Sequence, residues 1–224
     1  AGLQRARNPA RDVTFGDGRC VAAPAAGPPM VRGRDGRRRY GTLADYEDVA
    51  RLVQVSGAID HAGGGYCEIT DRPDAVRHLH ALRRTCELTD KAVMGHARSA
   101  GQVSDSLAMT RAVFGDRAMR SECCLVNLFN VESPLVLTGE TVEGMRLTAE
   151  AGQASLVTSY AILGMNAPVT MGAALSMMLA EIEAGIALVQ LFAPGAPAIA
   201  GCYGTPFSMS AMRPAFGAPE AMLL

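Results

Sequence analysis

The sequence of 224 residues has no tryptophan and a single lysine, Lys91. A P-loop of the form GxxxxGK[ST] needs a lysine directly after a glycine, and Lys91 follows Asp90, so this phosphate-binding motif is absent. The Rossmann fingerprint GxGxxG is also absent, because the glycines at 63–65 lack its spacing. Nucleotide binding through a phosphate cradle is therefore disfavoured.

The six cysteines form no CxxC pair and show no paired spacing. This argues against a disulfide framework and favours reduced thiols, and no signal peptide is visible, so we expect a cytoplasmic protein. Cys123 and Cys124 point to opposite faces of a predicted strand, and His78 and His80 point to different sides of a predicted helix. We predict no metal site, and zinc bound by His and Cys from separate strand ends stays an open alternative.

Charge is distributed unevenly along the chain. Residues 1–40 contain nine Arg and three Asp, a net charge of +6, so the remaining residues sum to −7 against a total of −1. A basic segment can bind nucleic acid, but this one has few aromatic side chains to stack on bases, so we predict no nucleic-acid partner. The apolar segment 175–192 is interrupted by Glu181, Glu183 and Gln190, which favours a core helix over a membrane span.

Residues 1–41 are rich in Gly, Pro and Arg and predict a small β-rich appendage. Asp17-Gly18 is a type I′ turn signal and predicts a hairpin. Asp35-Gly36 predicts a second turn of the same kind.

From residue 42 onward, predicted strands alternate with predicted helices. The strands are 58–60, 91–97, 122–130, 154–163 and 197–204, and the helices are 42–54, 72–88, 102–115, 138–152 and 170–193. Thr42 is a candidate N-cap and Gly152 a candidate C-cap. The regular alternation predicts an α/β fold with a parallel sheet, and both a doubly wound sheet and a (β/α) barrel fit it.

Four motifs occur in a fixed order and together resemble the trimethylamine methyltransferase family. They are SPLVL, GMNAPVTMGAAL, VQLFAPGAPAIAG and PAFGAPEAMLL, and the resemblance runs from about Asn8 to Leu224. It implies a (β/α)8 TIM-type barrel, incomplete in this chain: residues 42–224 would be a partial barrel behind the appendage. The five strands, and the uncapped pattern at Leu224, also predict a fragment.

The resemblance implies methyl transfer from a methylated amine, such as trimethylamine, or a betaine to the cobalt of a corrinoid protein. The corrinoid would be carried by that partner protein, and this chain would bind no cofactor, since no DxHxxG motif is present. We also expect no membrane association and a homo-oligomer. Members that act on trimethylamine itself use pyrrolysine, and the family pattern places that position beyond Leu224.

The loop 164–170 after the fourth strand would lie at the catalytic face of such a barrel. Gly164 permits unusual backbone geometry, Pro168 keeps its neighbour extended, and Thr170 would cap the next helix. The helix N-terminus would then favour a carboxylate, and Asn166 would contact substrate. A strand–helix turn without a ligand is the alternative interpretation.

Candidate site residues follow from what an N-methyl cation needs, namely aromatic faces and negative charge. Substrate-binding candidates at strand ends and in the loops after them are Phe129, Asn130, Tyr160, Tyr203, Phe207 and Phe216. Catalytic candidates are Glu132, His61 and His96. For each of these, a purely structural role is the alternative: core packing for an aromatic residue, a solvated loop acid, or a hydrogen-bonded histidine.

Two features leave other functions open. Members of the family commonly have Gly-Ala where this chain has Met212-Arg213, which could reshape or close the pocket. The alternative function is therefore a catalytically inactive barrel that binds a quaternary amine. An unrelated barrel lyase or hydrolase would need a metal constellation or a lysine at the catalytic end of a strand, whereas Lys91 lies at the opposite end of its strand. Because strands would be missing, the fragment alone is expected to be inactive.

Overall fold

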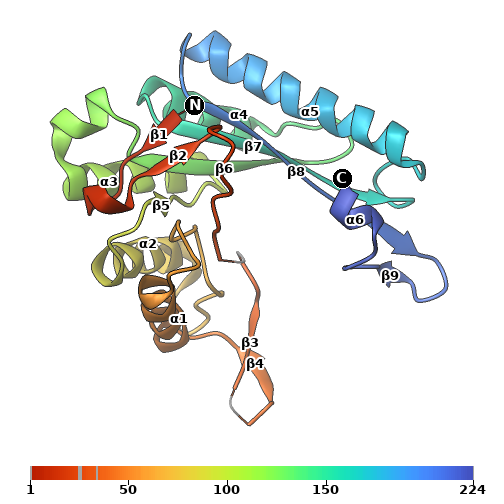
Figure 1. Cartoon of the computed structure of the whole chain (residues 1–224), viewed down its shortest axis with the longest axis horizontal. Coiled ribbons are helices and arrows are strands. Elements are labelled where there is room, and N and C mark those ends of the chain that lie inside the picture. Colours follow the sequence, from red (N-terminus) through yellow and green to blue (C-terminus); the bar gives the residue numbers. More distant parts are fainter. Residues whose placement is uncertain (1, 25–26, 34, 224) are drawn as a thin grey trace.

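The structure is a computed structural model that describes residues 2–24, 27–33 and 35–223. Its centre is a curled five-stranded sheet (Figure 1). The strands follow one another in chain order: β5 (Val93–Met94), β6 (Leu125–Val131), β7 (Ala154–Leu163), β8 (Ala198–Ser208) and β9 (Arg213–Pro214). β5 to β8 are parallel and β9 is antiparallel to β8. The predicted α/β class and parallel sheet are confirmed.

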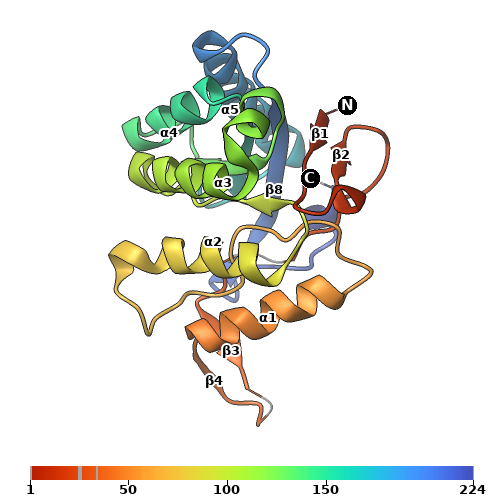
Figure 2. The ribbon, with the colours of Figure 1, turned by 90° about the vertical axis from the view of Figure 1, so that its left-hand side faces the viewer.

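Three helices cover one face of this sheet (Figure 2). They are α3 (Ala100–Ser121), α4 (Gly139–Glu150) and α5 (Met171–Phe192), and each begins after the strand that precedes it in the chain. Alternate residues of a strand point to opposite faces, so Phe129 and Val157, both almost fully buried, pack under these helices together with Met145 and Val189. The intervening residues, such as Leu128 and Thr158, line the opposite, inner face and are only partly buried.

The first predicted unit differs from expectation. Helices α1 (Leu43–Val55) and α2 (Arg77–Leu88) are present, with the 3₁₀ turn η2 (Asp74–Val76) before α2, but the predicted strand 58–60 is wrong. Pairing there is limited to a bridge between His61 and Ala92. The buried ammonium group of Lys91 donates to the carbonyl oxygens of Val53, Ser56 and Ile59. These carbonyls, at and just after the end of α1, are therefore bound by a side chain and do not pair in a strand.

The N-terminal segment holds two antiparallel strand pairs. β1 (Gly2–Gln4) pairs with β2 (Val13–Phe15) across the 3₁₀ turn η1 (Pro9–Arg11), so the hairpin predicted at Asp17-Gly18 is wrong. The Asp17 carboxylate accepts from the backbone N–H of Arg19, a local turn that needs no partner strand. The second predicted turn is confirmed by β3 (Met30–Arg32) and β4 (Arg38–Tyr40). The division of the chain into domains at residue 41 stays a prediction.

Predicted helix ends agree well with the structure. Thr42 and Asp45 form a reciprocal capping box at the start of α1, and Gly152, with φ of 69°, follows α4. Helix α3 is interrupted at Gly115, whose φ of 83° marks the predicted helix end, and a further helical stretch continues to Ser121. A short helix, α6 (Glu220–Leu223), lies at the end of the chain.

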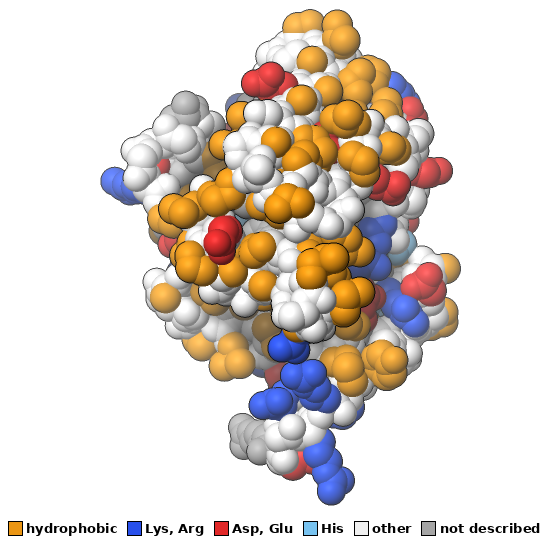
Figure 3. Space-filling view, turned by 90° about the vertical axis from the view of Figure 1, so that its right-hand side faces the viewer, with side chains coloured by type: hydrophobic (Ala, Val, Ile, Leu, Met, Phe, Trp, Pro, Cys, Tyr) orange, Lys and Arg blue, Asp and Glu red, His pale blue; other side chains and the backbone are white. Residues whose placement is uncertain are grey.

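The molecular surface differs from end to end. Figure 3 shows Lys and Arg side chains gathered at the bottom of the view, where the β3–β4 hairpin projects from the body. Above it, many hydrophobic side chains lie among uncharged and acidic ones on the same face, and exposed residues near β9 and α6 include Met212, Phe216 and Met222. Helix α5 is long and apolar enough to cross a membrane by length and composition alone, but it packs on β7, β8 and α4.

Candidate functional site

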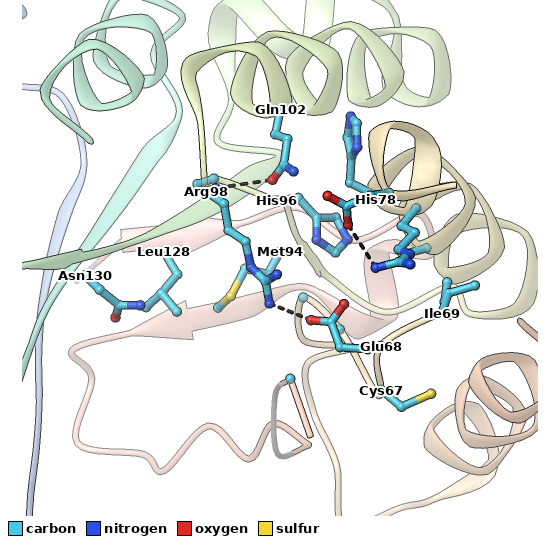
Figure 4. Close-up of a pocket in the computed structure, with 18 of the residues that line it drawn as sticks. Cys67, Glu68, Ile69, His78, Met94, His96, Arg98, Gln102, Leu128 and Asn130 are labelled. Atoms are coloured by element: carbon cyan, nitrogen blue, oxygen red, sulfur yellow. Dashed lines mark hydrogen bonds and ion pairs between the residues drawn. The ribbon is translucent and has the colours of Figure 1, made fainter. Parts of the chain in front are cut away.

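A cavity of about 440 Å³ lies beside the carboxyl ends of β5 and β6 (Figure 4). Its walls come from the segment 64–69, the beginning of α2, the segment 94–98 after β5, and the inner-face residues Leu128, Asn130 and Glu132 of β6 and the loop after it. In parallel α/β folds, ligands bind at this end of the strands. The volume is within the range of small-molecule sites.

Glycines allow two segments to meet at the cavity wall. Gly63 has φ of 73°, which favours glycine, and its carbonyl accepts from the N–H of Met94. A Cβ on Gly64 would lie 3.1 Å from the Met94 side chain, and one on Gly95 would lie 2.2 Å from Oδ1 of Asn127. The glycine triplet, which lacks nucleotide-binding spacing, therefore serves close packing onto the end of β5.

Two ion pairs balance most of the charge around the cavity. Arg98 contacts Glu68 at 2.6 Å, from the segment after β5 to the segment 64–69 (Figure 4), and Arg77 contacts Asp74 at 2.9 Å. Glu132, exposed at the cavity mouth, has no ion-pair partner within the described ranges. The ionisable acids and arginines of the lining thus leave one uncompensated carboxylate.

His96 is a neutral imidazole in the cavity wall. Burial, and to a smaller extent nearby His78 and Arg98, lower the pKa of His96 to about 4. Its backbone N–H donates to Oγ of Ser106, but its ring nitrogens have no hydrogen-bond partner in the part of the chain that the structure describes. The ring can therefore accept a hydrogen bond without adding positive charge.

His78 also lines the cavity, and sequence reasoning treated it only as a poor metal ligand. Its Nε2 lies 2.8 Å from Oδ2 of Asp105 on α3, and its ring centroid is 6.4 Å from that of His96. Its buried Nδ1 has no partner among the described atoms. No local signal links residues 27 positions apart on different helices, so only the packing of α2 against α3 reveals the pair.

His61 has a structural role in this fold. Its Nδ1 accepts from the N–H of Gly63 at 2.8 Å, and its Nε2 lies 3.0 Å from Oε1 of Gln4. The Gln4 amide donates to the carbonyl of Val93, so its oxygen accepts and Nε2 of His61 carries the proton. Burial lowers the pKa of His61 to about 4. Both ring nitrogens are engaged outside the cavity lining, and a catalytic role for His61 stays a prediction.

Phe129 and Asn166, both predicted to bind substrate, do not line the cavity, and their role in binding stays a prediction. Phe129 lies under α4, where a Cβ on Gly144 would come within 2.8 Å of its ring, so it is a core residue on the face away from the cavity. Asn166 accepts from the N–H of Ile162 and donates to the carbonyl of Tyr160. Its amide therefore shapes the loop after β7, and both of these bonds end on the main chain.

The remaining aromatic candidates gather on the inner face at β7 and β8. Tyr160 and Tyr203 are register partners with parallel rings 5.2 Å apart, and Phe216 lies 6.5 Å from Tyr203. Phe207 lies further along β8 and pairs with Pro214. None of these described side chains lines the cavity, so the structure brings together only Asn130, Glu132 and His96 of the predicted site.

Asn130 connects the cavity to that aromatic group. Its Oδ1 accepts from Oγ1 of Thr158, its register partner on β7. Tyr160 is two residues further along β7 and thus shares the inner face with Thr158. The inner face therefore continues from the cavity to the stacked tyrosines.

Thr170 occupies the N-cap position of α5, as predicted, although its side chain makes no capping hydrogen bond.

The sequence matches the family model described as trimethylamine methyltransferase (MTTB) over residues 3–224. The chain belongs to the trimethylamine methyltransferase family. It is 36% identical to a glycine betaine methyltransferase of Desulfitobacterium hafniense (strain Y51) over 222 residues, which cover 97% of this chain. It is also 33% identical to a proline betaine:corrinoid methyltransferase of Eubacterium limosum over 92 residues, which cover 41% of this chain and 19% of that protein.

These matches confirm the family that the ordered motifs predicted. The chain spans 46% of the length of the Desulfitobacterium family member, so about half of that protein has no counterpart here. Within the described residues no group of three or more His, Cys, Asp and Glu side chains is arranged to hold a metal ion.

Proposed function

We propose that this chain forms one part of a methyltransferase that moves a methyl group from a quaternary amine of the betaine type to the cobalt of a corrinoid protein. Family membership and the printed functions of both relatives support the reaction class. A (β/α)8 TIM-type barrel, completed by strands beyond those described, is the architecture that we propose for the whole protein. Trimethylamine is the other substrate that the family suggests.

The observation that carries this proposal is the uncompensated carboxylate of Glu132 at the cavity mouth. A quaternary ammonium group has no N–H, so it is recognised through charge and contact with π faces, and through no hydrogen bond of its own. A carboxylate attracts it, and the neutral ring of His96 does not repel it. Asn130, on the strand before Glu132, would contact the bound ligand.

A corrinoid would be held by a partner protein. The corrinoid would supply the cobalt nucleophile for methyl transfer. The residues of this chain fit the role of amine binding: the cavity of about 440 Å³ is of small-ligand size and its lining is polar around Glu132. The cytoplasm as location and a homo-oligomer as assembly stay predictions.

Titration with glycine betaine, monitored by calorimetry or by chemical shifts of His96 and Asn130, tests the proposal. We expect saturable binding, and Glu132→Gln should weaken it about tenfold, since a nearby unit charge contributes on the order of 1 kcal/mol or more. Glu183→Gln, exposed on α5, is the matched control. Equal binding by both variants would remove Glu132 from the site. Methyl transfer by the 224-residue chain alone would contradict its expected inactivity.

The alternative of an inactive binding barrel rested on Met212 and Arg213. Both side chains are exposed at the β8–β9 turn, and neither lines the cavity. They therefore give no reason to expect a blocked site in this part of the protein.

A further inference from the structure

The loop after β6 that carries Glu132 is closed on itself. The N–H of Glu132 donates to the carbonyl of Val136 at 2.9 Å, and the N–H of Val136 donates back at 3.1 Å. Between them Leu135 has φ of 60°, a left-handed conformation that is uncommon for a side chain of this kind. Such a backbone needs support from its surroundings, because the conformation is costly without it.

That support comes from Glu181 on α5, which sequence analysis used only as evidence against a membrane span. The side chain is 2% exposed. Its Oε1 accepts from the N–H of Leu135 at 2.7 Å, and its Oε2 accepts from Oγ of Ser133 at 2.8 Å. The same Oε2 accepts from Oγ of Ser159 on β7 at 2.5 Å.

Burying a carboxylate is unfavourable unless donors replace the water that it loses. No arginine or lysine of the described chain pairs with Glu181, so hydroxyl and amide donors alone satisfy it. An apolar residue on this face of α5 would avoid the desolvation penalty. Two of the three donors, Ser133 and Leu135, belong to the loop that begins at Glu132. This distribution indicates that the buried carboxylate stabilises the loop.

We propose that Glu181 is a positioning residue that fixes the loop 132–136 and thereby the direction of the Glu132 carboxylate at the cavity mouth. The inference deepens the proposed function and rests on it for the identity of the ligand. The fixing of the loop itself rests only on the hydrogen bonds of Glu181.

The first test is hydrogen exchange at the Leu135 amide, which donates directly to Glu181. We expect Glu181→Leu to accelerate this exchange at least tenfold relative to the matched control Glu183→Leu, which makes the same change at an exposed position of the same helix. Glu181→Gln should restore part of the protection, because its amide oxygen can still accept from Leu135. Equal exchange in Glu181→Leu and Glu183→Leu would overturn the proposal.

Two serine variants separate positioning from general stability, and they serve if Glu181→Leu does not fold. Ser133→Ala removes one of the two hydrogen bonds from the loop to Glu181 and leaves that of the Leu135 amide, whereas Ser159→Ala removes the hydrogen bond from β7. We expect Leu135 exchange to rise only in Ser133→Ala. If both variants raise it equally, Glu181 acts as an ordinary core contact.

The consequence for the site is measured with glycine betaine as the probe. Glu181→Leu should weaken binding by a factor similar to that of Glu132→Gln, and the double variant should bind no worse than Glu132→Gln, since one effect acts through the other. Additive losses would overturn the link between the two residues. If the unaltered chain binds no betaine, the proposed substrate is contradicted. The rate of Leu135 exchange still decides whether Glu181 fixes the loop.

Discussion

The inner face of the sheet is enclosed at β5 and open at β8. Beside β5, Gln4 and His61 cover the strand, and both side chains are almost fully buried. At β8, Tyr203 is 45% exposed and Phe216 is 64% exposed. The two halves belong to one continuous sheet with an unbroken parallel register from β5 to β8.

Alternation along a strand shows which residues share a face, but it does not show whether that face is covered. Phe129 and Tyr160 both lie near the ends of apolar strands, and sequence reasoning assigned both to substrate binding. Phe129 points to the helices and is core, whereas Tyr160 points to the inner face and is partly exposed. Burial depends on partners that are distant in sequence.

The largest contrast between the covered and open faces should appear on truncating one phenylalanine from each. Phe129→Ala removes a fully buried ring and should lower the free energy of unfolding by about 3–5 kcal/mol. Phe216→Ala, at an exposed position, should change it by less than about 0.5 kcal/mol. Urea unfolding followed by circular dichroism measures both. Similar losses would mean that the open half is covered in solution.

Lowering the pH should destabilise the protein mainly through buried histidines in the enclosed half. The folded pKa of His61, about 4, is below its ordinary value of 6.5 because burial disfavours the charged ring. Between these values the unfolded chain binds a proton that the folded chain does not. Stability therefore falls as the pH is lowered from 6.5 to 4, by about 3 kcal/mol from this group. His96 acts in the same direction.

His61→Gln isolates the contribution of His61 to this pH dependence. The variant should be less stable at pH 7, since it loses the hydrogen bonds of the imidazole ring with Gln4 and Gly63. Its stability should, however, depend less steeply on pH between 6.5 and 4. Urea unfolding at several pH values measures both quantities. An unchanged slope would show that His61 does not titrate with folding.

The packing of α5 on the covered face gives a smaller effect with a control on the same helix. A Cβ on Gly185 would lie 2.7 Å from Cγ1 of Val157, so Gly185→Ala should destabilise by about 1–3 kcal/mol through overpacking. A Cβ on Gly172 would meet nothing within 4 Å, and Gly172→Ala should be neutral or stabilising by up to about 1 kcal/mol. Thermal unfolding compares them, and a stabilising Gly185→Ala would contradict the close approach.

Much of the fold followed from local signals in the sequence. The capping residues Thr42 and Gly152, the turn at Asp35-Gly36 and the strand–helix alternation all depend on neighbours within a few residues. The failures required long-range information. Val13–Phe15 pairs with Gly2–Gln4 and not with the residues after Asp17-Gly18, and the strand expected at 58–60 is replaced by the contacts of Lys91.

The site was predicted in part for the same reason. Asn130, Glu132 and His96 follow strands, and strand ends meet at one edge of a parallel sheet, so their proximity to the cavity could be expected. His78 and Glu181 lie on helices, and their roles depend on Asp105 and on the loop at Ser133. Sequence spacing carries no information about those pairs, because helix packing brings them together.

The smallest expected effect concerns the stacked tyrosines of the open half. Tyr203→Ala removes a parallel-ring contact with Tyr160 and a side chain that is already 45% exposed, so it should lower the free energy of unfolding by only about 0.5–1.5 kcal/mol. The chain has five tyrosines, so the effect of this one substitution is measured by urea unfolding followed by circular dichroism. A loss as large as that of Phe129→Ala would mean that the stack is buried in solution, and the contrast between the two halves would then disappear.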